Sequence, residues 1–311
     1  MTRLPNTPAN PARRRGLLGA VSAVGGAALL QGCGNAARQA TVAGSAPALD
    51  AATDARLARL VAHAAPTCSI TATETEGPFP LRALLTGDAL LRSDITEGKP
   101  GVPLALRIKL LDLTRGCTPL VGAWVYVWHC DRSGLYSGYD GMGNDGQVGK
   151  TYLRGIQRTD ANGCVTFKTL YPGWYEGRIT HVHCMVFPGD RLLSSRSPSA
   201  ATTQFAFPEA ATAAVYAQYD KGPNTSVRRL EDDNVFADGT ATEMLALEGQ
   251  VETGYAAGIV VGVDPGAVIP LGGDGPPPGG MPPPGGPGGP GRPPPPGMPF
   301  GPMPRSRKSS P

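Results

Sequence analysis

Four short runs rich in β-branched and aromatic residues constrain the fold of this chain more than any other feature. They cover residues 104–112, 123–130, 165–167 and 180–187, and turn-forming Gly, Pro, Asp and Asn residues separate them. Two further strand-like runs follow at residues 244–252 and 256–263. Short β-rich runs between turn signals are typical of antiparallel sandwiches. The sequence therefore predicts an all-β fold, an antiparallel β-sandwich with a few short helices.

Two helices are expected beside these strands. Leu57, Leu60, Val61 and Ala64 recur at helical spacing and predict an amphipathic helix within residues 49–65. Pro208 precedes an alanine-rich run, and proline is favoured at the first position of a helix, so a second helix is expected after it.

Residues 1–35 have the pattern of an export signal. Arginines at positions 13–15 precede an apolar Gly- and Ala-rich stretch that ends at residue 30, and two arginines followed by x-Leu-Leu indicate the twin-arginine route. Cys33 follows in a sequence similar to a bacterial lipoprotein box. Three alternatives remain: cleavage with lipidation of Cys33, cleavage near Ala36, or retention as an anchor. We expect an exported protein, in the periplasm or at the cell surface, with a membrane tether if Cys33 is lipidated.

The rest of the chain divides into a tether with the first helix (residues 36–66), the sandwich (residues 67–271) and a tail (residues 272–311). The tail has 16 Pro and 12 Gly in 40 residues, a composition that cannot bury a core and is typical of disorder. A spacer and a polyproline segment that binds a partner both remain open. The net charge is +3 without a basic patch interleaved with aromatic residues, which argues against nucleic acid as a partner. The oligomeric state is left open.

Export changes the interpretation of the cysteines, because an oxidising compartment permits disulfides. Five cysteines follow Cys33, and none of them forms a Cys-x-x-Cys pair of the kind found in zinc and thioredoxin-type sites. We expect two structural bridges and one buried thiol, and the pairing stays open. The five residues are Cys68, Cys117, Cys130, Cys164 and Cys184.

His181 and His183 are the candidate metal ligands with the clearest geometry. Side chains at i and i+2 of a strand lie on the same face, so both imidazoles can reach one ion. Tyr175 precedes this pair, and Tyr136, with Tyr139 as its rival, follows the run at residues 123–130. Phenolate oxygens are hard anionic donors whose usual pKa near 10 falls only beside a strong Lewis acid. This donor set favours Fe(III) over Fe(II), zinc or copper.

Six motifs occur in a fixed order between residues 68 and 240. They are Glu76-Gly77-Pro78-Phe79, Leu91-Arg92-Ser93-Asp94-Ile95, Gly134-Leu135-Tyr136-Ser137, Pro172-Gly173-Trp174-Tyr175, Arg178-Ile179-Thr180-His181-Val182-His183 and Thr203-Gln204-Phe205. Taken together they resemble the intradiol ring-cleavage dioxygenases. The resemblance is greatest to the exported branch that is similar to the protocatechuate 3,4-dioxygenase beta chain.

The resemblance implies a prealbumin-like β-sandwich with a non-haem ferric ion held by Tyr136, Tyr175, His181 and His183. It also implies an enzyme of aromatic compound catabolism that cleaves a catechol-type ring with O2 to a cis,cis-muconate-type product. Both atoms of O2 would be incorporated. Tyr175 would be the ligand that leaves and takes up a catechol proton.

Two further residues match family positions that face the substrate. Arg178 would stabilise negative charge that develops on the ring, and Gln204 would orient an oxygen by hydrogen bonding. The sequence departs from the protocatechuate enzymes in its short loop between Tyr175 and His181, and from the family in having Ala206 where an aromatic residue is usual. Both departures reduce the pocket wall, so the substituents on the catechol stay open.

Two other functions remain as alternatives. The first is an exported metal-binding β-sandwich surface module without turnover, against which the presence of Arg178 and Gln204 argues. The second is another His-x-His metalloenzyme that uses copper or zinc. For single residues, His129 and Trp128 are expected in the core, and an ordinary salt bridge is the simplest alternative for Arg178.

Overall fold

The strands form two sheets that pack as a sandwich, as the sequence predicts. The computed structural model describes residues 49–63, 68–192 and 194–270. The expected export signal with Cys33, the tether up to residue 48 and the tail lie outside these residues. The described elements are α1 (Ala51–His63), β1 (Pro103–Asp112), β2 (Thr118–Pro119), β3 (Trp124–Trp128), β4 (Arg154–Arg158), β5 (Cys164–Leu170), β6 (His181–Phe187), β7 (Ala201–Ala206), α2 (Glu209–Tyr216), β8 (Ala246–Gln250) and β9 (Gly254–Val263), with short 3-10 helices at Arg82–Leu84, Asp88–Leu90, Leu113–Arg115 and Leu230–Asp232.

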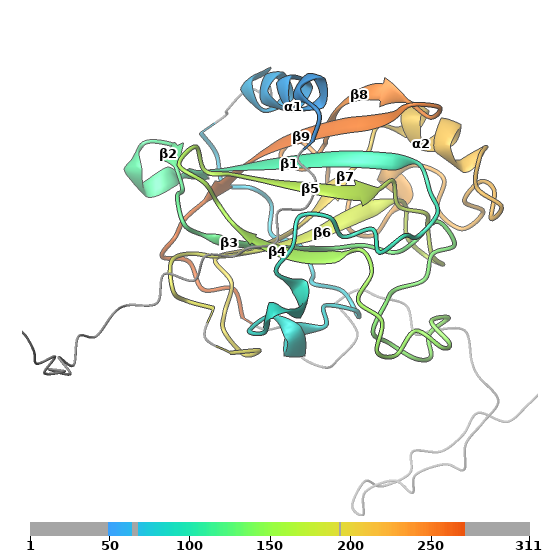
Figure 1. Ribbon diagram of the computed structural model, residues 1–311, viewed down its shortest axis with the longest axis horizontal. Helices are drawn as coiled ribbons and strands as arrows, with labels where there is room; N and C mark the ends of the chain where they lie inside the picture. Colours follow the sequence, from blue (N-terminus) through green and yellow to red (C-terminus); the bar gives the residue numbers. More distant parts are fainter. Residues whose placement is uncertain (1–48, 64–67, 193, 271–311) are drawn as a thin grey trace, which may run out of the picture. The chain divides into compact units, whose positions relative to one another are not determined.

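The first sheet has the strand order β2-β1-β9-β8, with β5 also paired to β1, and the second has the order β4-β3-β6-β7 (Figure 1). Every pairing between these strands is antiparallel except that of β1 with β9, which is parallel. A parallel pair needs a long crossover connection. In this chain β2 to β8 come between β1 and β9 in the sequence, so the last strand of the fold returns to pair with the first.

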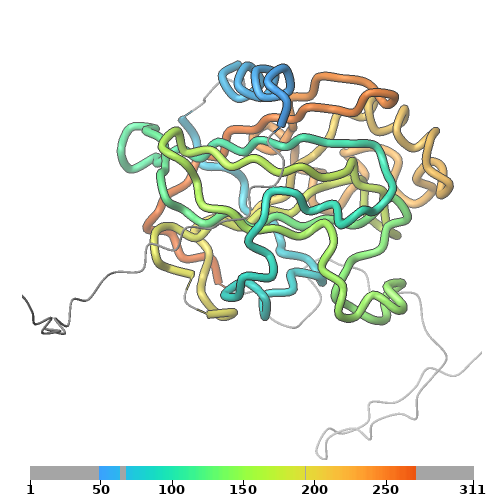
Figure 2. The backbone as a smooth tube through the Cα atoms, viewed as in Figure 1, coloured from blue at the N-terminus to red at the C-terminus, as the bar shows by residue number. Residues whose placement is uncertain are grey.

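Alternation along the strands separates a core face from an outer face in the second sheet. Val182 and Val186 of β6 belong to the buried cluster between the sheets, together with Leu106 of β1. Their neighbours on β6 therefore point outward. The segment before β1 and the connection between β3 and β4 run below β3 and β4 in Figure 2 and cover this outer face. A second buried cluster, which includes Trp128 and Tyr136, fills the space beneath them.

The helix α1 covers the outer face of the first sheet (Figure 1). Leu57 and Leu60 pack on Ala105 of β1 and Ala256 of β9. Gly258 permits the close approach, because a Cβ at that position would lie 2.7 Å from the Cβ of Leu60. The predicted amphipathic helix is confirmed. Across the three described ranges, no helix combines the length and the apolar character needed to cross a membrane.

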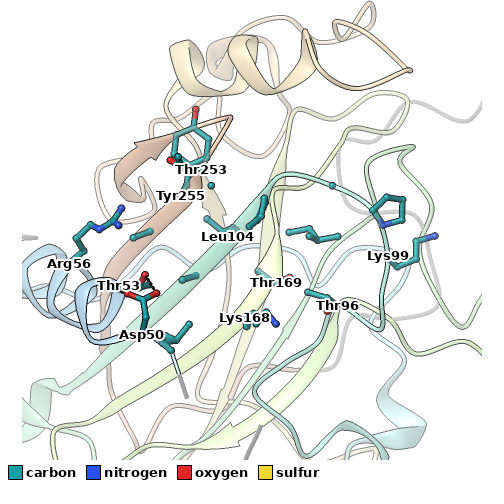
Figure 3. A pocket seen from close by; sticks show the side chains of 18 residues that line it. Asp50, Thr53, Arg56, Thr96, Lys99, Leu104, Lys168, Thr169, Thr253 and Tyr255 are labelled. Atoms are coloured by element: carbon teal, nitrogen blue, oxygen red, sulfur yellow. Dashed lines mark hydrogen bonds between the residues drawn. The ribbon is translucent and has the colours of Figure 1, made fainter. Parts of the chain in front are cut away.

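A cleft of about 470 Å³ opens between the N-terminal end of α1 and the first residues of β1 and β9 (Figure 3). Arg56, Lys99 and Lys168 are among the residues that line it. Lys99 and Lys168 are already engaged in ion pairs with aspartates. None of the six candidate site residues lines this cleft, so it is separate from the predicted site.

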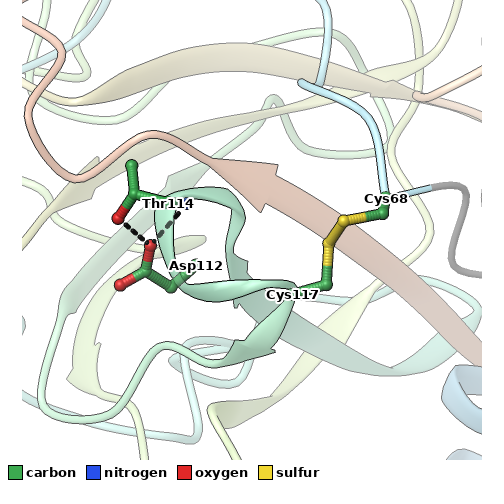
Figure 4. The surroundings of a disulfide bond; sticks show 4 residues. All are labelled: Cys68, Asp112, Thr114 and Cys117. Carbon is green, nitrogen blue, oxygen red and sulfur yellow. Dashed lines mark hydrogen bonds between the residues drawn. A yellow bond between two sulfur atoms is a disulfide. The ribbon is translucent and has the colours of Figure 1, made fainter.

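One disulfide forms within the described residues, where two were expected. Cys68 and Cys117 are bonded, with their Cα atoms 5.9 Å apart (Figure 4). Cys130, Cys164 and Cys184 are free thiols. The expectation of a second bridge is wrong because these three residues are separated by the sheets. Cys184 lies in the core cluster between the sheets, Cys130 in the cluster on the outer face of the second sheet, and Cys164 at the start of β5 in the first sheet.

Candidate metal centre

His181 and His183 lie on β6 and face the outer side of the second sheet, with their Nε2 atoms 3.1 Å apart. His181 Nδ1 donates a hydrogen bond to the carbonyl oxygen of Ile179 at 2.6 Å, which leaves the lone pair on Nε2. Burial, followed by the charge of Arg178, lowers the pKa of His181 well below its usual value. Burial, followed by His181, does the same to the pKa of His183. Both imidazoles are therefore neutral and available as ligands.

Tyr136 joins the histidines from the connection between β3 and β4. Its side chain is fully buried, and its hydroxyl lies 3.3 Å from His181 Nε2. The rival residue Tyr139 is held elsewhere, since its hydroxyl accepts a hydrogen bond from the backbone N–H of Leu81 at 2.7 Å. The structure thus brings Tyr136, rather than Tyr139, to the histidine pair.

Tyr175 reaches the same group from the loop that precedes β6. Its ring centroid lies 5.5 Å from that of Tyr136 and 5.6 Å from that of His181. This loop packs against the turn before Tyr136, where Gly134 has a φ of +86° and a Cβ would lie 2.1 Å from the carbonyl oxygen of Trp174. Only glycine permits both the positive φ and this contact. The glycine therefore keeps the two tyrosine-bearing loops together.

The four side chains suit a ferric ion. Among the residues described by the structure, no three His, Cys, Asp or Glu side chains form a metal-binding group, and the candidate donors beside the two histidines are Tyr136 and Tyr175. Burial raises the pKa of Tyr136 well above its usual value and also raises that of Tyr175. A strong Lewis acid would reverse this effect by stabilising the phenolates. Two ligands about 2.1 Å from one ion and at right angles lie about 3.0 Å apart, which agrees with the 3.1 Å between the imidazole nitrogens.

Arg178 links the candidate ligands to a buried polar network. Its Nη1 donates to the hydroxyl of Tyr175 at 3.5 Å, and its Nη2 donates to Oε1 of Gln204 at 2.7 Å. Its Nε forms an ion pair with the fully buried carboxylate of Asp233 at 3.0 Å. The salt bridge considered as an alternative for Arg178 and the contacts to the site therefore occur together. In the sequence, nothing distinguishes Asp233 from the two acidic residues before it, so it was not predicted as part of the site.

One row of paired residues crosses the second sheet through the site. Arg154 of β4 pairs with Trp128 of β3, Trp128 pairs with His183 of β6, and His183 pairs with Gln204 of β7. The indole of Trp128 stacks on the imidazole of His183, with centroids 4.7 Å apart and ring planes 4° from parallel. His129 is buried as predicted, and its Nε2 hydrogen-bonds to Thr169. The register explains how Gln204 comes to lie beside His183.

The segment before β1 supplies two contacts to the site, from Gly77 and Phe79. Both residues belong to the first family motif, but no role was predicted for either of them. The ring of Phe79 stacks on Tyr136 with centroids 4.7 Å apart. Gly77 has a φ of +67°, and a Cβ there would lie 3.0 Å from Cε1 of His183. The segment therefore lies directly against both a candidate tyrosine ligand and a candidate histidine ligand.

Comparison with solved structures finds the same fold in known dioxygenases. An intradiol ring-cleavage dioxygenase from Tetranychus urticae is 26% identical, with a TM-score of 0.54, over 65% of this chain and 98% of its own. The dioxygenase Tetur07g02040 is also 26% identical, with a TM-score of 0.55, over 65% of this chain and 97% of its own.

No protein-family model matches the sequence, and no curated protein matches it either. The structural matches do not test the narrower similarity to the protocatechuate 3,4-dioxygenase beta chain, which stays a prediction. The two-sheet architecture and the two dioxygenase structures that share it over nearly their full length show that this chain has the fold of the intradiol ring-cleavage dioxygenases and is similar to that family.

Proposed function

We propose that the protein is a non-haem Fe(III) intradiol dioxygenase that cleaves a catechol-type ring with O2 to a cis,cis-muconate-type product. The observation that carries this proposal is the convergence of His181 Nε2 with His183 Nε2 at 3.1 Å and with the Tyr136 hydroxyl at 3.3 Å. Tyr175 and Arg178 lie beside this group. The reaction balances without a further reductant, because both oxygen atoms enter the product.

In this proposal Tyr136, Tyr175, His181 and His183 hold the iron. A ferric ion bound there would supply a Lewis acid for both catechol oxygens and would draw electron density from the ring, which opens a ring carbon to O2. Tyr136, His181 and His183 are buried beneath the outer-face connections, and Tyr175 is partly buried beside them. Exclusion of water strengthens every electrostatic interaction within the site.

Three side chains act on the substrate. The Tyr175 phenolate oxygen would take up a proton from a catechol hydroxyl and become a neutral hydroxyl, and the adjacent Arg178 Nη1, 3.5 Å away, stabilises the negative charge of that oxygen before transfer. The Arg178 guanidinium, fixed by Asp233, then faces the charge that develops on the ring. Gln204 accepts from Arg178 through Oε1 and donates to the carbonyl oxygen of Thr75 through Nε2. These two hydrogen bonds fix the orientation of the Gln204 amide, whose Nε2 has a second hydrogen to donate to an oxygen of the reacting group.

Product analysis with labelled oxygen tests the proposal. The full chain loaded with Fe(III) is given catechol under 18O2, and we expect one muconate per O2 consumed, with both labelled atoms in the product. An Arg178→Gln variant should retain iron and lose most of the turnover. Iron binding without oxygen uptake for any of a panel of substituted catechols would instead favour the metal-binding surface module.

Export is a second proposal, and it rests on the N-terminal sequence. The Cys68–Cys117 bond supports it, because such bonds persist mainly in oxidising compartments. Replacement of Arg14 and Arg15 by lysine should leave the protein in the cytoplasm, and Cys33→Ala should abolish incorporation of labelled fatty acid. An unchanged distribution of the arginine variant would exclude the twin-arginine route.

A further inference from the structure

Arg154 is a fully buried cation beside the candidate metal centre. It lies on β4 at the end of the row that passes through Trp128 to His183. Within the part of the chain that the structure describes, Arg154 forms no ion pair with a carboxylate. Arginine is rarely buried without a partner, because transfer of an unpaired charge from water is costly. The position of this charge therefore requires an explanation.

Neutral oxygen atoms hold the guanidinium in place. Its Nε donates to Ser137 Oγ at 2.9 Å, and its Nη2 donates to the Ser137 carbonyl oxygen at 2.8 Å. Its Nη1 donates to the carbonyl oxygen of Phe79 at 2.7 Å and to the hydroxyl of Tyr126 at 3.0 Å. Ser137 follows Tyr136 in the chain, and Phe79 stacks on the Tyr136 ring. One side chain thus fastens both backbone segments that hold this phenol.

The charge of the guanidinium also faces the phenol. Its carbon atom lies 6.0 Å from the ring centroid of Tyr136 and 5.6 Å from that of Tyr139. These distances are within the range of a cation–π contact. Because the acceptors around Arg154 are neutral, its charge is not cancelled by them. A phenolate at Tyr136 is an anion that this cation would stabilise.

We propose that Arg154 is a positioning residue that orients Tyr136 and supplies the counter-charge for its phenolate as a ligand. This inference rests on the proposed function, in which Tyr136 binds the ferric ion. It assigns to β4, which sequence reasoning did not identify as part of the site, a role in holding and tuning one ligand.

Arg92 provides a matched control. It also donates to backbone carbonyl oxygens, those of Thr151 and Arg154, at 2.7 Å and 3.0 Å. It differs in having a carboxylate partner, Glu97, at 2.6 Å. If Arg154, like the partly buried Arg92, serves only to tie backbone segments together, substitution of either arginine should have the same effects.

The first test compares Arg154→Gln, Arg154→Lys and Arg92→Gln in the iron-loaded full chain. Loss of the cation raises the energy of the phenolate electrons, so the charge-transfer band of Arg154→Gln should move to longer wavelength by on the order of 20 nm. Iron affinity should fall about tenfold. Arg154→Lys should restore most of both values, and Arg92→Gln should change neither. An Arg154→Gln band at the wild-type position, or the same shift in both glutamine variants, would overturn the proposal.

The second test needs no iron and therefore separates this inference from the proposed function. In crystals of the metal-free protein, Arg154→Gln should displace the Tyr136 ring from its stack on Phe79, whereas Arg92→Gln should not. An undisturbed Tyr136 would overturn the positioning role even if the wild-type protein bound no iron. If Arg154→Gln does not fold, Ser137→Asp takes its place in the first test, because its carboxylate would cancel the guanidinium charge, and Arg154→Lys, which cannot make all four hydrogen bonds of the guanidinium, takes its place in the second. Ser137→Asp should give the same spectral shift.

Discussion

Substitution of Asp233 tests whether its ion pair organises the substrate side of the site. The carboxylate is fully buried and accepts hydrogen bonds from Arg178 Nε at 3.0 Å, Ile179 N at 2.7 Å and Val235 N at 2.9 Å. Asp233→Asn leaves the guanidinium without its counter-charge. Removal of one partner of a buried pair costs about 3–5 kcal/mol. Asparagine retains one carbonyl oxygen as an acceptor, so we expect a loss near the lower end, about 3 kcal/mol.

Urea unfolding of a double-mutant cycle measures this effect. The free energy of unfolding is compared for the wild type, Asp233→Asn, Arg178→Gln and the double variant, and the coupling energy should reach about 2 kcal/mol. The exposed pair Arg132–Asp220, at 2.8 Å with side chains 34% and 84% exposed, is the matched control. Its coupling should stay below about 1 kcal/mol. A coupling for the buried pair no larger than that of the control would refute the reasoning.

Three further predictions follow from named contacts. Tyr136→Phe should weaken iron binding and shift or bleach the visible band, whereas Tyr139→Phe should leave both unchanged. Gly77→Ala places a Cβ 3.0 Å from a site imidazole and should lower iron affinity, whereas Gly98→Ala, with a φ of +69° and no atom within 4 Å, should affect stability alone. Burial, followed by a neighbouring glutamate, raises the pKa of Glu243 to about 8. The folded state then retains a proton that the unfolded state loses, so the melting temperature should fall as the pH rises from about 4.5 to about 8, and Glu243→Gln should flatten this slope.

Each of these predictions has a result that contradicts it. The same change of the visible band in both phenylalanine variants would mean that Tyr136 is not the ligand. Equal iron affinity of the two alanine variants would mean that the contact to the imidazole does not matter. A pH slope that persists in Glu243→Gln would assign the titration to another group.

The strands that sequence patterns predicted are those with apolar alternation. β1, β3 and β6 combine β-branched or aromatic residues with a face buried between the sheets. β4 was missed because its five residues include two arginines and a glutamine. β7 was missed because its two threonines and glutamine resemble a loop. The parallel pairing of β1 with β9 joins strands from opposite ends of the sandwich sequence, and no local sequence pattern predicts such a pairing.

Some residues of the site could be predicted from the sequence and others could not. The two-residue period of a strand places His181 and His183 on one face, so their proximity follows from the sequence itself. Tyr136 and Tyr175 come from loops, where no period fixes direction, so their donor chemistry made them candidates and the family resemblance made them specific. Asp233 and Arg154 act through contacts across the fold. Asp233 contacts Arg178, which is 55 residues away in the sequence, and Arg154 contacts Phe79, which is 75 residues away. Their roles appear only once the elements are packed.

The visible absorption spectrum of the full chain with Fe(III), before and after anaerobic addition of catechol, reports on the proposed ferric site itself. We expect a tyrosinate-to-Fe(III) charge-transfer band in the protein that is shifted or bleached in Tyr136→Phe and that moves to longer wavelength when catechol binds. A protein that stays colourless after ferric iron is supplied would contradict the assignment of Tyr136, Tyr175, His181 and His183 as a ferric site, and with it the proposed dioxygenase chemistry.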